Sequence, residues 1–135
     1  MLIVSILPAN FLEVAQALLE TSGEGKDEAK LRSAVSRSYY GALHQAITTA
    51  DELDIPKPLA SGMGTHLQVA QRLKNHSKPL ARLAARLRTA KLTRCQADYD
   101  LKDDITPEEA ALNVKKCHDI ASDLQRMRPR TSASL

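Results

Sequence analysis

The sequence predicts an all-α protein, an antiparallel bundle of four to five helices. Apolar residues recur every three or four positions in five successive segments, which is typical of helices that bury one face. No segment shows a convincing strand pattern. Aromatic residues are scarce, so Leu, Ala, Val and Ile must form the core. The length of 135 residues fits one domain, predicted over residues 1–128, followed by a flexible tail over residues 129–135.

The N-terminal segment, residues 1–7, is apolar but too short to cross a membrane. We expect it to pack against the bundle, so no membrane association is predicted. The first helix is expected to open around Pro8. Asn10 is the predicted N-cap, because an Asn side chain can accept a hydrogen bond from a backbone N–H group at a helix start.

The longest predicted helix, residues 27–50, organises the rest of the chain. It is expected to begin near Asp27, whose charge suits a helix N-terminus, and to end around residues 51–53. Its apolar positions form a wide face that should lie in the core. The predicted buried residues are Leu31, Ala34, Val35, Ser38, Tyr39, Ala42, Leu43, Gln45, Ala46, Ile47 and Ala50.

Three further helices follow, each with a recognisable start. Thr65 is the predicted cap of the third helix, and Ser77 is the predicted N-cap of the fourth. The fourth helix is expected to fray over residues 97–104. Thr106 followed by Pro107 predicts the start of the fifth helix, because Pro is favoured at the first helical position.

Charge is distributed unevenly along the chain. The net charge is only +3, but residues 55–97 contain no Asp or Glu. A basic side of this kind suits a polyanion, so the sequence predicts contact with nucleic acid. The alternative is that each cation pairs with an acid from elsewhere in the chain. The candidate nucleic-acid-binding residues are Lys78, Arg82, Arg86, Arg88 and Lys91.

The cysteines and most of the histidines lack the spacing of a metal site. Cys95 and Cys117 share no metal or redox motif, so we expect reduced thiols in a cytoplasmic protein. His66, His76 and His118 stand singly. The sequence therefore predicts neither a metal nor a cofactor.

A polar stripe on the long helix is the best candidate for chemistry. Arg37, Tyr40, Gly41 and His44 are spaced i, i+3, i+4 and i+7, which places them on one side of a helix. His44 could transfer protons to or from a phosphodiester, while Arg37 could hold the phosphate. Gly41 would let another group approach closely. The alternative is that Arg37 and His44 only pair with bundle carboxylates such as Asp98.

Arg94 falls where the apolar stripe of the fourth helix would have its next member, so it should be half-buried with a charged partner. Asp98 lies one turn further on. Two roles remain open for the pair. It could support the stripe of Arg37, Tyr40 and His44, or it could fix how the fourth helix meets the second.

Residues 32–44, RSAVSRSYYGALH, resemble the R-x-A-x-S-R-x-Y-Y-x-x-x-H signature of small HEPN-domain proteins. Later landmarks of that family follow in order, namely His66 before an apolar helix and the segment ADYD at residues 97–100, after Arg94. The resemblance covers roughly residues 8–126. It implies a bundle of four or five helices that often forms a homodimer.

The resemblance also implies a function. Many HEPN proteins are toxins or defence components that cut RNA without a metal, using an Arg and a His that correspond here to Arg37 and His44. Relatives are often encoded beside a nucleotidyltransferase that acts as the antitoxin. Position 38 is Ser where many nuclease members have Asn, Asp or His, and position 46 is Ala where the tyrosine-modified members have Tyr.

We therefore expect a metal-independent ribonuclease, the toxin of a toxin–antitoxin or phage-defence pair, with RNA and a second copy of the chain as partners. Arg37 and His44 are the expected catalytic residues, supported by Tyr40, Arg94 and Asp98. The alternative is a non-catalytic module that binds a nucleotide or a partner nucleotidyltransferase. A weaker alternative is a helical adaptor whose basic side meets an acidic protein.

Overall fold

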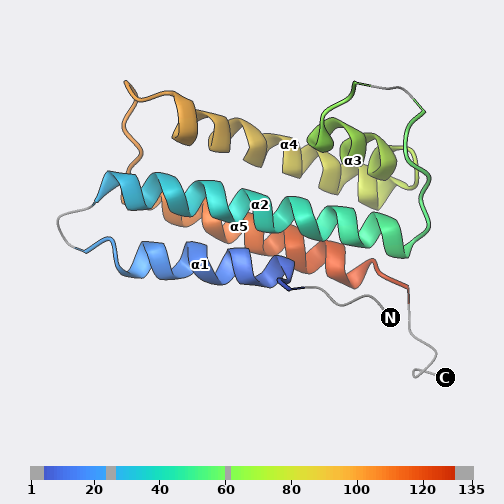
Figure 1. Ribbon diagram of the computed structural model, residues 1–135, viewed down its shortest axis with the longest axis horizontal. Helices are drawn as coiled ribbons and strands as arrows, with labels where there is room; N and C mark the ends of the chain where they lie inside the picture. The colour runs from blue at the N-terminus through green and yellow to red at the C-terminus, as the bar shows by residue number, and fades with distance from the viewer. Residues whose placement is uncertain (1–4, 24–26, 60–61, 130–135) are drawn as a thin grey trace.

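The computed structural model describes residues 5–23, 27–59 and 62–129, and it is an all-α bundle (Figure 1). This confirms the predicted fold class, and no strand occurs within those residues. Residues 1–4 of the N-terminal segment and residues 130–135 of the predicted tail lie outside the described residues. The helices are α1 (Pro8–Glu20), α2 (Glu28–Glu52), α3 (Thr65–Lys74), α4 (Lys78–Tyr99) and α5 (Pro107–Arg126).

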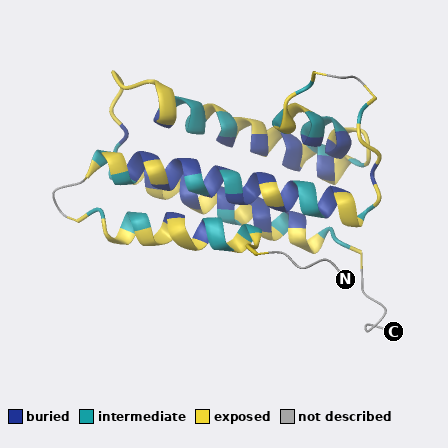
Figure 2. Cartoon of the chain, viewed as in Figure 1, coloured by how far each residue is buried: buried dark blue, intermediate teal, exposed yellow. Residues whose placement is uncertain are grey.

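Helix α2 is the centre of the bundle and contacts each of the other four helices. In Figure 1 it runs between α1 and α4, with α5 behind it. Because α2 has neighbours on most sides, its predicted face is buried along nearly its full length (Figure 2). Ile47 alone among the predicted residues is only partly buried. The prediction that this helix organises the chain is therefore confirmed.

The largest part of the core lies where α2, α3, α4 and α5 meet. Side chains such as Leu73, Leu80, Leu87, Ile120 and Leu124 are almost completely buried there. Each contributes roughly 1.5–3 kcal/mol by leaving water. The core is aliphatic, as the composition predicts, and Tyr39 is its one fully buried aromatic side chain among the described residues.

Three predicted helix starts are confirmed by hydrogen bonds. The side chains of Asp27, Ser77 and Thr106 accept hydrogen bonds from backbone N–H groups three residues further on, at 3.2, 3.3 and 3.1 Å. Each hydrogen bond satisfies a backbone N–H group that has no partner within the helix. Each contributes about 1 kcal/mol to the stability of the fold.

Two other predicted caps are wrong. The N-cap of α1 is Leu7, and Asn10 is the third helical residue, where its Oδ1 accepts a hydrogen bond from the Leu7 N–H at 2.7 Å. Asn10 therefore caps the helix from inside, as Glu or Gln often does. Gly64 is the N-cap of α3, and Thr65 is already its first helical residue.

The described part of the N-terminal segment is not buried. Ile6 and Leu7 are 53% and 55% exposed. Ile6 and Leu7 therefore lie against the surface of the bundle and are not part of its core. They line a surface pocket together with Phe11 and His44.

Gly41 marks the closest approach of α1 to α2. A Cβ atom at Gly41 would lie 2.8 Å from Leu12 Cγ and 3.2 Å from the Pro8 carbonyl oxygen. The group that approaches Gly41 is therefore helix α1 of the same chain. Gly41 is a packing residue, and it is covered although it belongs to the polar stripe.

The substitution Gly41→Ala should lower the free energy of unfolding by about 0.5–2 kcal/mol. The new methyl group forces Leu12 and α1 outward, which costs about 1–3 kcal/mol, and the preference for Ala over Gly inside a helix offsets only about 0.5–1 kcal/mol of this. Urea unfolding measures the change. Ser33→Ala, at an exposed position of the same helix, is the control and should change stability little. Equal or greater stability of Gly41→Ala would contradict the close approach.

Candidate functional site

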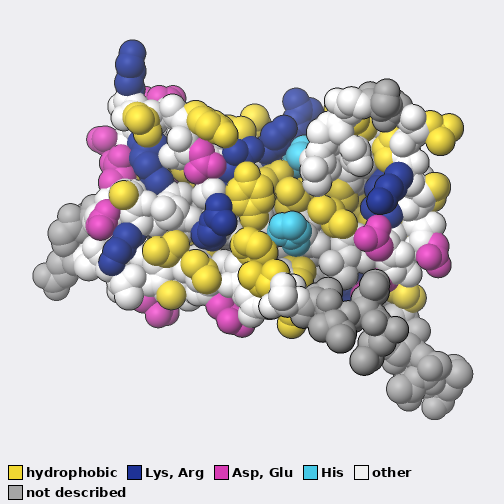
Figure 3. Space-filling model, viewed as in Figure 1, with side chains coloured by type: hydrophobic (Ala, Val, Ile, Leu, Met, Phe, Trp, Pro, Cys, Tyr) yellow, Lys and Arg dark blue, Asp and Glu magenta, His cyan; other side chains and the backbone are white. Residues whose placement is uncertain are grey.

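The stripe of Arg37, Tyr40 and His44 faces the surface. His44 is exposed, and Arg37 and Tyr40 are partly buried. Figure 3 shows this side of the molecule, with histidine and basic side chains around a central hydrophobic area. These residues are therefore accessible to a ligand, whereas Gly41 in the same stripe is covered by α1.

Arg37 presents its guanidinium group without a carboxylate partner. Its Cζ lies 5.2 Å from the centroid of the Tyr40 ring, a cation–π contact that orients the planar group. Arg37 forms no ion pair with any described residue. A cation–π contact uses the face of the guanidinium, so its N–H groups can still bind a phosphate.

His44 is held by stacking. Its ring lies on Phe11 of α1, with the ring centroids 5.1 Å apart and the planes inclined by 22°. The positions of Arg37 and His44 imply a separation of about 10 Å along the helix axis. His44 lines a surface pocket with Leu7 and Phe11, and Arg37 is not among the residues that line it.

Arg94 lies beside this stripe and is largely buried, as predicted. Its side chain is 12% exposed, and its Nη1 donates a hydrogen bond to Asp98 Oδ2 at 3.3 Å. Its guanidinium also lies over the rings of Tyr39 and Tyr40, at 5.4 and 5.6 Å from their centroids. Arg94 therefore links α4 to α2 and lies over the Tyr40 ring, as Arg37 does.

The Asp98 carboxylate binds two side chains outside the stripe. Besides Arg94, it accepts a hydrogen bond from Ser36 Oγ at 3.2 Å. It forms no ion pair with Arg37 or His44. In this structure Asp98 therefore does not neutralise Arg37 or His44, which was the alternative for this pair.

Tyr39 and His66 form a pair that the sequence analysis missed. The Tyr39 hydroxyl lies 2.7 Å from His66 Nδ1. Burial raises the pKa of Tyr39, so its hydroxyl stays protonated at pH 7. In the tautomer in which this hydroxyl donates to Nδ1, the His66 N–H group is on Nε2. Burial and the nearby cations Lys91, Arg88 and Arg94 lower the pKa of His66 to about 4, so its ring is neutral at pH 7.

The substitution Tyr39→Phe should lower the free energy of unfolding by about 1–2 kcal/mol, since Nδ1 of the half-buried His66 ring loses its hydrogen-bond partner. Urea unfolding measures the change. His76→Ala, at an exposed position, is the control and should change stability little. Stability of Tyr39→Phe equal to that of the wild type would contradict the hydrogen bond.

The same pair predicts how stability depends on pH. The pKa of His66 is lower in the folded state than in the unfolded state, so the unfolded chain binds more protons between pH 6.5 and 4. Stability should be complete above pH 6.5 and decline as the pH falls toward 4, by about 1–2 kcal/mol for a ring that is only half-buried. Urea unfolding at pH 7 and pH 5 measures this, and stability that rises on acidification would contradict it.

The predicted nucleic-acid-binding residues of α4 fall into two groups. Arg82 and Arg86 line a pocket beside α5, where Arg86 pairs with Asp123 at 2.8 Å. Arg88 and Lys91 line a groove beside α3. Lys78 is exposed at the start of the helix. The chain therefore carries two basic surfaces on opposite sides of α4.

No family model matches this chain, and no curated protein matches it. The resemblance of residues 32–44 to the HEPN signature thus rests on those residues and the later landmarks alone. None of the helices in the described part of the chain is both long and apolar enough to cross a membrane. Within the same residues, no three His, Cys, Asp or Glu side chains are grouped so that they could hold a metal ion. Cys95 and Cys117 are free thiols.

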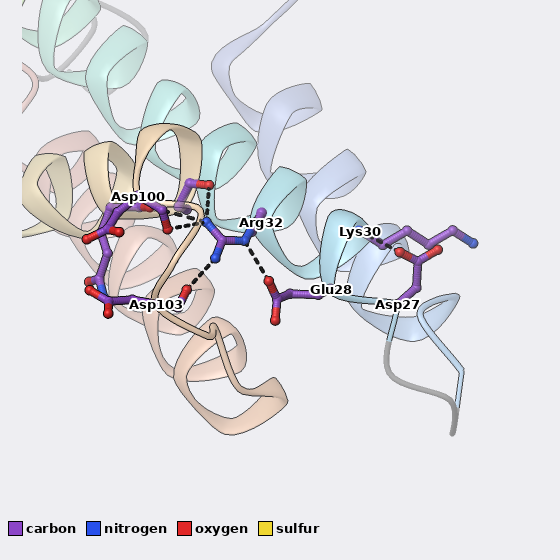
Figure 4. Close-up of polar contacts among 8 residues, drawn as sticks. Asp27, Glu28, Lys30, Arg32, Asp100 and Asp103 are labelled. Atoms are coloured by element: carbon purple, nitrogen blue, oxygen red, sulfur yellow. Dashed lines mark hydrogen bonds and ion pairs between the residues drawn. The ribbon is translucent and has the colours of Figure 1, made fainter.

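Arg32, the first residue of the signature, has a structural role that the sequence analysis missed. Figure 4 shows its guanidinium pointing from α2 into the end of α4. It donates to the backbone carbonyl oxygens of Ala97 and Asp100 at 2.8 and 3.0 Å, and also to that of Asp103. Glu28 accepts from its Nε at 2.9 Å.

These contacts place Arg32 as the C-terminal cap of α4. The last carbonyl groups of a helix have no partner within the helix, and a buried Arg satisfies several of them at once. Arg32 is only 9% exposed. It fixes the segment 97–103, and with it Asp98, against α2.

Proposed function

We propose that the chain is a metal-independent ribonuclease in which Arg37 and His44 act on a phosphodiester of RNA. The observation that carries this proposal is the free guanidinium of Arg37. Six other arginines pair with a carboxylate, whereas Arg37, Arg82 and Arg88 form no ion pair with a described residue. Among these three, Arg37 is the one that lies over an aromatic ring of the described residues, that of Tyr40. A surface cation kept in a fixed orientation suits an external anion.

The chemistry follows from the two groups. The ribose 2′-hydroxyl attacks the adjacent phosphorus while the His44 imidazole accepts its proton, and the bond to the 5′-oxygen breaks. The products are a 2′,3′-cyclic phosphate and a 5′-hydroxyl end. Arg37 stabilises the charge that develops on the phosphate oxygens through paired N–H bonds. The 5′-oxygen takes a proton from water or from the His44 of a second copy in a homodimer.

The neighbouring residues have supporting roles in this proposal. Tyr40 orients Arg37, and Arg94 with Asp98 holds Tyr40 against α4. The basic residues of α4 would attract the RNA backbone, with Arg86 contributing least because it is already paired. Salt should therefore weaken the association.

The biological setting proposed is a toxin of a toxin–antitoxin or phage-defence pair in the cytoplasm, with a nucleotidyltransferase as the partner. It rests on the resemblance of residues 32–44 to the HEPN signature.

One observation favours the second candidate, a non-catalytic module. His44 stacks on Phe11 and forms no ion pair with a described carboxylate that would orient the ring for proton transfer. In this case the same surface would bind a nucleotide or a partner nucleotidyltransferase without turnover.

Incubation of the purified chain with single-stranded RNA in EDTA separates the two candidates. The ribonuclease predicts fragments that carry 2′,3′-cyclic phosphate ends, identified by mass spectrometry. Intact RNA with a folded protein would contradict it and favour the binding module. Cleavage that requires added Mg²⁺ would also contradict it.

A further inference from the structure

A second site lies in the groove between α3 and α4. The groove has a volume of about 710 Å³, within the range of pockets that hold small organic ligands. Its floor is aliphatic, and no Phe, Tyr or Trp is among the described residues that line it. The apolar lining consists of Leu67, Ala70, Ala81, Ala84, Ala85 and Leu92.

Two of these apolar side chains are unusually open to solvent. Leu67 is 50% exposed and Leu92 is 62% exposed, and both line the same groove. The alanines between them leave room above the helix backbones. An aliphatic chain lying there would remove both leucines from water, gaining about 25 cal/mol for each Å² of apolar surface covered.

Cations line both ends of the groove. Lys74 lines one end. At the other end Arg88 and Lys91 lie close to His66, and the charges of Arg88 and Lys91 act on the His66 ring. Neither cation forms an ion pair with a described residue, and no acidic residue lines the groove. The positive field at this end is therefore not neutralised by the chain.

His66 adds a fixed hydrogen-bond donor at the same end. When its Nδ1 accepts a hydrogen bond from the Tyr39 hydroxyl, its N–H group is on Nε2. The buried Tyr39 side chain holds the ring in place. A neutral, oriented imidazole beside Arg88 and Lys91 is an arrangement that binds an anionic head group.

We propose that this groove binds a soluble organic anion of the alkyl phosphate class. The alkyl chain runs from the end with Leu67 and Leu92 along the floor of Ala85, Ala84 and Ala81. The phosphate is held by Arg88, Lys91 and the Nε2–H group of His66. The length of the groove supports a single chain, since Lys74 and His66 at its two ends are eight residues apart on α3, about 12 Å. The site uses neither Arg37 nor His44, and it does not depend on RNA cleavage.

Isothermal titration calorimetry with decyl phosphate, below its micelle concentration, tests the proposal. Decyl phosphate should bind at least about tenfold more tightly than inorganic phosphate, because the chain covers apolar surface. Arg88→Ala and Lys91→Ala should each weaken binding about tenfold or more, because a charge-assisted hydrogen bond is lost. Arg82→Ala, an unpaired arginine on the other side of α4, is the matched control and should leave binding unchanged.

Two further measurements test the groove without removing a charge. Ala85→Trp, at an exposed position of the groove, should fill it and abolish binding while the thermal unfolding midpoint stays near that of the wild type. In the wild type, decyl phosphate should shift the His66 ring signals in NMR.

Several outcomes would overturn the proposal. Inorganic phosphate binding as tightly as decyl phosphate would show that the aliphatic floor has no role. Adenosine monophosphate or an RNA oligonucleotide binding more tightly than decyl phosphate would assign the groove to a different ligand class. Equal weakening by Arg82→Ala and Arg88→Ala would indicate general charge attraction only.

Discussion

Arg32→Ala is expected to lower the free energy of unfolding by about 3–5 kcal/mol, the range for removing one partner from a buried charged network. The buried guanidinium of Arg32 binds the carbonyl oxygens of Ala97, Asp100 and Asp103 at the end of α4. Without it these acceptors remain unsatisfied, and the segment 97–103 loses its attachment to α2. Urea unfolding, followed by circular dichroism, measures the loss.

Two controls separate this effect from loss of positive charge. Arg32→Lys keeps the charge but lacks the planar fork, so it should lose most of the same stability. Arg37→Ala removes an arginine from the same helix, at a position without an ion pair, and should change stability by no more than about 0.5 kcal/mol. Equal effects of Arg32→Ala and Arg37→Ala would contradict the capping role.

Arg37→Ala should reduce RNA cleavage by about 10²-fold or more, the usual cost of removing a donor that stabilises transition-state charge. The fold should remain intact, because the Arg37 guanidinium lies over the Tyr40 ring and forms no ion pair with a described residue. Arg37→Lys should recover only part of the activity, since an ammonium cannot bind a phosphate in the paired way. Cleavage of a labelled RNA under single-turnover conditions measures both variants.

Arg82→Ala is the matched control for Arg37→Ala. Arg82 is exposed and, like Arg37, forms no ion pair with a described residue, but it lies beside α5, away from the stripe on α2. Loss of the Arg82 side chain should weaken RNA binding modestly, and the rate at which bound RNA is cleaved should stay unchanged. If Arg37→Ala behaves like Arg82→Ala, Arg37 contributes only general attraction.

The fold could be predicted from the sequence because its signals are local. The 3.6-residue periodicity of residues 31–50 identifies the buried face of α2, and the capping side chains of Asp27, Ser77 and Thr106 identify three helix starts. The predicted N-cap of α1 is wrong because Asn10 accepts its hydrogen bond from the Leu7 N–H group while it occupies the third helical position. Local sequence does not distinguish these two positions for Asn.

The contacts between distant residues could not be predicted. Gly41 is covered by Leu12 and Arg32 reaches Ala97, and both contacts depend on how helices pack rather than on spacing within one helix. The Tyr39–His66 pair joins residues 27 positions apart, although both belong to the segments that resemble the HEPN landmarks. Periodicity also could not show that Arg88 and Lys91 face α3 while Arg82 and Arg86 face α5.

The most direct test of the proposed ribonuclease is cleavage of total cellular RNA in EDTA by three proteins side by side, the wild type, His44→Ala and His76→Ala. Both histidines are exposed, but only His44 lies on the stripe with Arg37. We predict cleavage by the wild type and by His76→Ala, and a loss of about 10²–10⁴-fold in His44→Ala. Cleavage by His44→Ala at the wild-type rate, or none by the folded wild type, would contradict a catalytic site on α2.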